Sequence, residues 1–84
     1  MAQAERPKGK GFGDDRYRAL IARLVQARKE AGLSQEGIAK RMGKHQQFVS
    51  RYETGERRLD VVEFCDIARL LGLDPAALIA SVPA

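Results

Sequence analysis

The sequence has 84 residues, of which 44% are apolar and 31% charged, and a formal net charge of +4. This length allows one domain with a limited core, and the composition is typical of a globular rather than a disordered chain. No apolar run is long enough to span a bilayer and no secretory signal is evident, so we expect a cytoplasmic protein. The single cysteine, Cys65, and the single histidine, His45, provide neither an internal disulfide nor a zinc site, so no metal or other cofactor is expected. The excess of basic residues favours a polyanionic partner.

Two regions differ in composition. Residues 1–13 contain glycines and a proline with few apolar side chains, which predicts a flexible basic tail. From Asp14 onward, apolar residues recur every three or four positions, and glycines separate the segments that show this pattern. We therefore expect one helical domain over residues 14–84.

Helix signals define the first half of this domain. The first helix is expected over residues 14–31, where apolar side chains form a stripe on one face, and Gly32 ends it. A short second helix follows Ser34, a favourable N-cap, and ends at Gly43. The third helix is expected over residues 46–54.

Capping signals locate the last two helices. Asp60 and Glu63 form an acidic variant of the capping box, and Gly72 ends the fourth helix. The fifth helix starts with Asp74 as N-cap and Pro75 in its first position. No segment alternates apolar and polar residues over a length that would predict a strand. The expected fold is therefore all-α, a compact arrangement of five short helices.

The segment from Ser34 to Gly55 carries the most informative pattern. Two helices that cross steeply need a small residue where they touch, which Ala39 supplies. The tight turn between them needs a residue with free backbone angles, which Gly43 supplies. Val49 is an aliphatic residue in the middle of the second of these helices and is expected to dock it. Together these features predict a helix-turn-helix.

A set of residues in and around this segment matches one known family. The matching positions are Leu33 to Gln35, Ala39 with Gly43, Ser50 to Glu53, Gly55, and Ile67 to Gly72. Residues 14–81 thereby resemble the phage-repressor and Cro-like helix-turn-helix family, whose members are called XRE-type regulators. The resemblance implies a lambda-repressor-like DNA-binding domain whose third helix enters the major groove of double-stranded DNA.

Side chains of the third helix are candidates for contacts with bases. Gln46 and Gln47 stand where some phage repressors carry a pair of glutamines, and a glutamine amide can pair with N6 and N7 of adenine. Arg51 lies one turn further and can reach guanine or a phosphate. Phe48 either contacts a thymine methyl group or packs against the second helix. The alternative for Gln46, Gln47 and Arg51 is an ordinary solvated helix face.

Further polar residues are candidates for contacts with DNA phosphates, which set register rather than sequence preference. They are Gln35, His45, Ser50, Thr54, Arg57 and Arg58. Gln35 would act together with the N-terminus of the second helix, which favours anions. His45 replaces the usual Ser or Thr cap, so the third helix is expected to start more loosely. The alternative for Arg57 and Arg58 is a solvated loop.

Family members often pair an arginine of the first helix with the glutamate that ends the third. Arg28 and Glu53 stand at the matching positions, so the resemblance implies a structural ion pair that holds the recognition helix. Removing one partner would cost about 3–5 kcal/mol if the pair is buried and at most about 1 kcal/mol if it is exposed.

A dimer is expected, because one recognition helix contacts only a few base pairs. A symmetric homodimer would bind a palindromic operator with half-sites about 34 Å apart. More apolar residues occur near the C-terminus than one small core needs. The expected dimer surface comprises Leu70, Leu73, Leu78 and Ile79, with Val62 as a further apolar residue.

The sequence therefore predicts a sequence-specific DNA-binding transcriptional regulator. Two alternatives stay open: the antitoxin of a toxin–antitoxin pair, which would also bind a protein toxin, and a protein-interaction module that has lost DNA binding. An enzyme is not expected, because no nucleophile is accompanied by a base. The tail, with Arg6, Lys8 and Lys10, either enters the minor groove or has no role in binding, and the second option is favoured.

Overall fold

The computed structural model describes residues 13–84, which form five helices. The helices are α1 (Asp15–Glu30), α2 (Gln35–Met42), α3 (Gln46–Thr54), α4 (Val61–Leu70) and α5 (Pro75–Ala80). Each lies where the sequence predicts it, and the described residues contain no strand, so the all-α prediction is confirmed. The predicted tail, with Arg6, Lys8 and Lys10, lies outside the described residues apart from Gly13.

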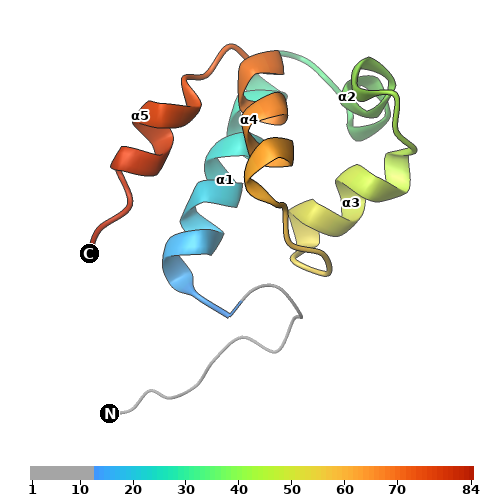
Figure 1. Ribbon diagram of the computed structural model, residues 1–84. Helices are drawn as coiled ribbons and strands as arrows, with labels where there is room; N and C mark the ends of the chain where they lie inside the picture. The colour runs from blue at the N-terminus through green and yellow to red at the C-terminus, as the bar shows by residue number, and fades with distance from the viewer. Residues whose placement is uncertain (1–12) are drawn as a thin grey trace.

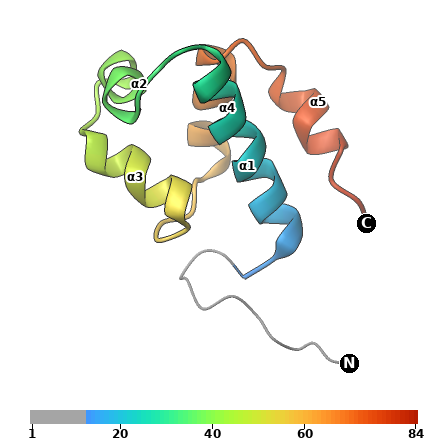
Figure 2. The ribbon, with the colours of Figure 1, turned by 180° about the vertical axis from the view of Figure 1, so that it is seen from behind.

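The helices pack around a central pair. α1 and α4 overlap in the middle of both views of the molecule, with α2 and α3 on one side of them and α5 on the other (Figures 1 and 2). The C-terminal segment contacts α1, where Nη1 of Arg16 donates to the carbonyl oxygen of Pro83 over 3.2 Å. Before α4, the N–H of Leu59 donates to the hydroxyl of Tyr17 over 3.0 Å. The pair formed by α2 and α3 therefore projects from a base that α1 and α4 provide.

Side-chain caps start four of the five helices. Asp14, Ser34, Asp60 and Asp74 each accept a hydrogen bond from a backbone N–H in the first turn that follows. α3 differs, because the side chain of His45 makes no such bond. The helix for which the sequence predicts a looser start thus lacks a side-chain cap.

The core joins all five helices. Its largest fully buried side chains are Ile21, Leu24, Ile38, Val49, Tyr52 and Ile67. Fully burying an aliphatic side chain of this size contributes about 1.5–3 kcal/mol. Leu78 of α5 also belongs to this core, with 4% of its surface exposed. The core therefore holds α5 through a residue that the sequence placed on a dimer surface.

Residues 13–84 carry neither a membrane-spanning helix nor a cluster of metal ligands. No helix there combines the length and the apolar character that crossing a membrane requires. No group of three or more His, Cys, Asp or Glu side chains is placed there to hold a metal ion.

Candidate nucleic-acid interface

α2 and α3 are joined by a tight turn and pack closely against each other. At Gly43 the backbone is left-handed, with a φ of 67°, which residues with a Cβ rarely adopt. The N–H of Lys44 donates to the carbonyl oxygen of Ala39 over 2.9 Å, and Ala39 is buried. Val49 and Tyr52 bury the inner face of α3. The turn residue, the small contact residue and the docking residue predicted from the sequence thus form a helix-turn-helix.

The outer face of α3 carries the polar side chains that were predicted to contact DNA. Gln46, Gln47 and Arg51 are exposed, and Ser50 is half-buried. Thr54 is exposed, and its hydroxyl donates to the carbonyl oxygen of Arg51 over 3.2 Å. At 3.6 residues per turn these positions share one side of the helix, opposite the buried face. The structure therefore brings them together on one solvent-facing surface.

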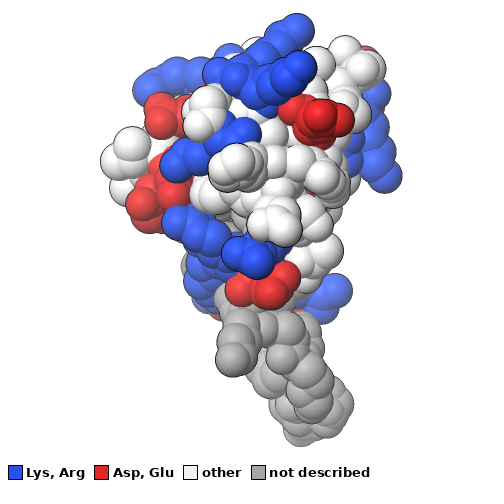
Figure 3. Space-filling model, turned by 90° about the vertical axis from the view of Figure 1, so that its right-hand side faces the viewer, with Lys and Arg blue, Asp and Glu red and all other residues white. Residues whose placement is uncertain are grey.

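Basic residues are concentrated in the helix-turn-helix. Residues 35–58 contain six Lys and Arg against three Glu, whereas the other described residues contain six Lys and Arg against seven Asp and Glu. Figure 3, which views the molecule from the side of α2 and α3, shows basic side chains spread over this face with fewer acidic ones among them. The surface around α3 therefore suits a polyanion.

Polar side chains from α1, α2 and α3 form a hydrogen-bonded chain. Nε of Arg28 donates to Oε2 of Glu53 over 2.7 Å, and Nη2 of Arg28 donates to Oε1 of Glu53 over 3.1 Å. Nε2 of Gln35 donates to the same Oε1 over 2.9 Å. Nε2 of Gln46 then donates to Oε1 of Gln35 over 2.9 Å. The sequence analysis did not predict the contacts that Gln35 makes. Their only sequence signal was that α2 and α3 each begin with a glutamine.

The ion pair at the inner end of this chain is buried. The side chains of Arg28 and Glu53 are 10% and 7% exposed. Nη1 of Arg28 also donates to the carbonyl oxygen of Leu33 over 2.8 Å. The hydrogen bonds to Glu53 raise the pKa of Arg28 above its usual value, because they stabilise the charged guanidinium. The pair therefore ties α1 to the C-terminal end of α3.

The ring of Phe48 contacts another aromatic ring and two basic side chains within the protein. Its ring meets that of Tyr52 edge to face, with the ring centres 5.6 Å apart. Nζ of Lys44 lies 5.0 Å from the centre of the Phe48 ring, and Cζ of Arg57 lies 4.9 Å from it. Arg57 also donates to both carboxylate oxygens of Glu63, over 3.0 and 2.9 Å. Phe48 and Glu63 thus hold two cations at the edge of α3.

Known proteins share this architecture. The sequence model of the helix-turn-helix family matches residues 24–78. An uncharacterised HTH-type transcriptional regulator, y4dJ, of Sinorhizobium fredii is 31% identical over 65 residues, which span 77% of this chain and 84% of that protein. The solved structure of an XRE-family like protein from Pseudomonas syringae pv. tomato is 48% identical with a TM-score of 0.76, and the match covers 81% of this chain and 83% of that one.

The chain belongs to the helix-turn-helix family, in its XRE-type group. The resemblance and the five-helix fold predicted from the sequence are thereby confirmed. The same matches support the coarse functional prediction, a DNA-binding transcriptional regulator, and the prediction that the chain is not an enzyme.

The other candidates for phosphate contacts lie at the edges of the helix-turn-helix in this XRE-type protein. Gln35 is half-buried at the start of α2, and His45 is exposed just before α3. Cζ of Arg58 lies 4.3 Å from the centre of the Tyr17 ring. Arg57 is held by Glu63. The two arginines of the loop after α3 are therefore positioned by neighbouring side chains.

The residues expected at a dimer surface divide into two groups. Leu78 is buried in the core of this XRE-type protein, so its side chain is used within one protomer. Ile79 is 45% exposed and Val62 is 64% exposed, whereas Leu70 and Leu73 are half-buried. The apolar surface available for a partner near α5 therefore centres on Ile79 rather than on Leu78.

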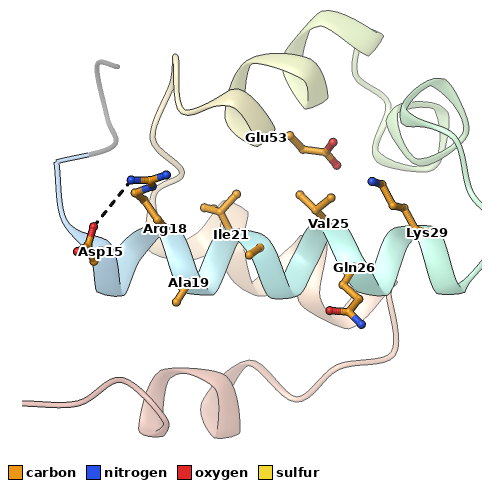
Figure 4. Close-up of a pocket in the computed structure, with 9 residues that line it drawn as sticks. Asp15, Arg18, Ala19, Ile21, Val25, Gln26, Lys29 and Glu53 are labelled. Atoms are coloured by element: carbon orange, nitrogen blue, oxygen red, sulfur yellow. Dashed lines mark ion pairs between the residues drawn. The ribbon is translucent and has the colours of Figure 1, made fainter. Parts of the chain in front are cut away.

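A groove of about 760 Å³ runs along α1 in this XRE-type protein. Ile21 and Val25 line its apolar part, and Glu53 reaches toward it from α3 near Lys29 (Figure 4). Glu53 therefore lines this groove and is also part of the hydrogen-bonded chain that leads to Gln46.

Proposed function

We propose that this chain is a cytoplasmic, sequence-specific DNA-binding regulator that recognises a palindromic operator as a homodimer through α3. The observation that carries the proposal is the division of α3 into two faces. Val49 and Tyr52 are buried, whereas Gln46, Gln47 and Arg51 face solvent. A helix divided in this way can enter the major groove without giving up its contacts with the core.

The exposed side chains of α3 carry donors and acceptors that match base edges. A glutamine amide pairs with N6 and N7 of adenine, and an arginine pairs with O6 and N7 of guanine. Under the proposal, Gln46 and Gln47 contact bases from the first turn of α3, and Arg51 contacts a base or a phosphate one turn later. Phe48 contributes by holding Lys44 and Arg57 beside the DNA backbone.

Phosphate contacts would come from polar residues around the same two helices. They are Gln35, His45, Ser50, Thr54, Arg57 and Arg58. The start of α3 supports this role, because no side chain caps it and the N-terminus of a helix attracts anions. The basic character of residues 35–58 adds a sequence-independent attraction to DNA.

The homodimer would form through the apolar surface near α5. Ile79 is exposed there, and Leu70 and Leu73 contribute partly exposed side chains. Two copies related by a two-fold axis would place their α3 helices in successive major grooves, about 34 Å apart. Sedimentation should show a dimer at micromolar concentration that Ile79→Asp dissociates, and a monomer for both proteins would contradict the dimer.

DNA binding is tested by fluorescence anisotropy at two salt concentrations. The labelled duplex carries the DNA immediately upstream of the gene for this chain, and a scrambled duplex is the comparison. Gln46→Ala and Gln47→Ala remove the proposed base contacts. Gln26→Ala is the matched control, because Gln26 is an exposed glutamine of α1 whose partner is Glu30 on the same helix.

If the proposal is correct, the protein should bind the upstream duplex at least about a thousandfold more tightly than the scrambled duplex. Gln46→Ala and Gln47→Ala should reduce this preference, and Gln26→Ala should leave it unchanged. Equal binding of both duplexes with a steep salt dependence would indicate an attraction to DNA without sequence preference. No binding at all would favour a protein partner.

A further inference from the structure

We infer that Glu53, although buried and away from the outer face of α3, determines which base Gln46 prefers. The inference rests on the proposed function, because it concerns the same helix and the same DNA. Its basis is the pair of hydrogen bonds that joins Glu53 to Gln46 through Gln35. Glu53 is a positioning residue, since it acts through Gln35 and touches no base.

Glu53 is held as an acceptor at both carboxylate oxygens. The guanidinium of Arg28 can only donate, and it contacts Oε2 through Nε and Oε1 through Nη2. Because Oε1 has no proton to offer, Gln35 must turn its Nε2 toward Glu53 and its Oε1 away from it. Burial enforces this orientation, because little water reaches the Glu53 side chain to satisfy a reversed amide.

The orientation of Gln35 is passed on to Gln46. Oε1 of Gln35 faces α3 and accepts from Nε2 of Gln46 over 2.9 Å. This bond uses one of the two N–H donors of Gln46 and leaves the other donor and the carbonyl oxygen for a ligand. One donor beside one acceptor is complementary to adenine, which offers N7 as an acceptor and its N6 amino group as a donor. Guanine presents two acceptors, N7 and O6, and matches this pattern poorly.

Replacing the carboxylate by an amide should reverse the chain. In Glu53→Gln the side-chain oxygen stays with Arg28, and the new N–H points toward Gln35. Gln35 then turns its Oε1 toward position 53 and its Nε2 toward Gln46, whose carbonyl oxygen turns inward to accept. Both N–H groups of Gln46 then face the DNA, which suits guanine. Gln35→Leu instead cuts the chain and frees the Gln46 amide to turn.

The test measures base preference rather than affinity alone. A library of random duplexes is selected with the full chain, and the base pair whose preference is lost in Gln46→Ala is assigned to Gln46. Anisotropy then gives the affinity of wild type, Glu53→Gln and Gln35→Leu for duplexes with adenine or guanine at this position. Glu30→Gln is the matched control, since the exposed Glu30 carboxylate also accepts from a glutamine, Gln26, over 3.1 Å.

The wild type and Glu30→Gln should bind the adenine duplex about tenfold or more tightly than the guanine duplex. Glu53→Gln should abolish or invert this ratio, and Gln35→Leu should bring it to within about threefold of equality. If Glu53 has a purely structural role, Glu53→Gln should instead lower the affinity for both duplexes by the same factor. The ratio of the two affinities would then stay unchanged, which would overturn the inference.

Unfolding curves decide which variant is interpreted. If Glu53→Gln does not fold, Gln35→Leu decides alone, because it leaves the contact between Arg28 and Glu53 in place, and an unchanged adenine preference would then overturn the inference. A wild type that selects no sequence would overturn the proposed function together with the inference. A selective wild type whose variants keep its preference would overturn the inference alone.

Discussion

The two ends of α3 are held in opposite ways. At the C-terminal end, Tyr52 is buried and Glu53 is bonded to Arg28 and Gln35. At the N-terminal end, His45 provides no side-chain cap, and Gln46 and Gln47 are exposed. The helix is therefore fixed by the end that carries the ion pair, and its first turn has no side-chain cap. Breaking the ion pair at the first end should lower stability, and removing exposed side chains at the second should weaken binding.

The largest effect is expected when the buried ion pair is broken. Arg28→Ala leaves the Glu53 carboxylate without its cation in a site that is 7% exposed, so it should cost about 3–5 kcal/mol of unfolding free energy. Urea denaturation followed by circular dichroism measures this loss. Arg57→Ala breaks the partly exposed pair with Glu63 and should cost at most about 1 kcal/mol.

The double variant Arg28→Met with Glu53→Leu separates an unpaired charge from lost packing. Because it removes both charges together, it should recover much of the stability that Arg28→Ala loses. A cost for Arg28→Ala as small as that for Arg57→Ala would show that the C-terminal end of α3 is not held by a buried charge pair.

The sequence predicts those features of the two ends of α3 that depend on neighbouring residues. The bounds of α3 and the missing cap follow from Gly55 and His45, which act on neighbouring backbone groups. The contact between Arg28 and Glu53 crosses 25 positions and came only from the family resemblance. The contact between Gln35 and Gln46 was not predicted, because it depends on the angle at which α2 meets α3.

The burial of Leu78 was not predicted from the sequence, for a second reason. It lies on α5, which has only six residues, fewer than two turns. So short a helix does not reveal which of two adjacent apolar residues, Leu78 or Ile79, faces the core. The structure assigns Leu78 to the core and leaves Ile79 exposed.

Truncating an exposed glutamine at the N-terminal end of α3 should change binding while stability stays the same. Gln46→Ala removes an exposed side chain, so its unfolding free energy should stay within about 0.5 kcal/mol of the wild type. Its affinity for the selected duplex should fall by about 1–3 kcal/mol, the value of a bidentate contact with a base. A matched loss of stability would contradict the division between the two ends.

A cap added to the same end should make α3 resemble the other helices. His45→Ser places a hydroxyl at the N-cap of α3, the position that Ser34 occupies in α2. It should stabilise the protein by about 1 kcal/mol. For a domain of this size, this gain raises Tm by about 4–8 °C. Ser34→Ala is the reciprocal control and should lower Tm by a similar amount. An unchanged Tm in His45→Ser would indicate that the first turn of α3 is already satisfied.

The smallest effect concerns the ion pair between Arg57 and Glu63, and it should depend on pH. Hydrogen bonds from Arg57 lower the pKa of the Glu63 carboxyl below its usual value of 4.5. A carboxyl with a lowered pKa in the folded state stabilises the protein above its unfolded pKa, and this contribution is lost as pH falls through the folded pKa. Glu63→Gln keeps a side chain that can complete the capping box with Asp60, but it removes the charge.

At pH 7, Glu63→Gln should therefore be less stable than the wild type by at most about 1 kcal/mol. The difference should shrink as the pH is lowered below 4.5, because the wild type then loses its own charge at this position. Urea denaturation of both proteins between pH 7 and pH 3 measures this convergence. Equal stability of the two proteins at every pH would mean that Glu63 stabilises α4 as a cap alone, because Glu63→Gln keeps the cap and removes only the charge.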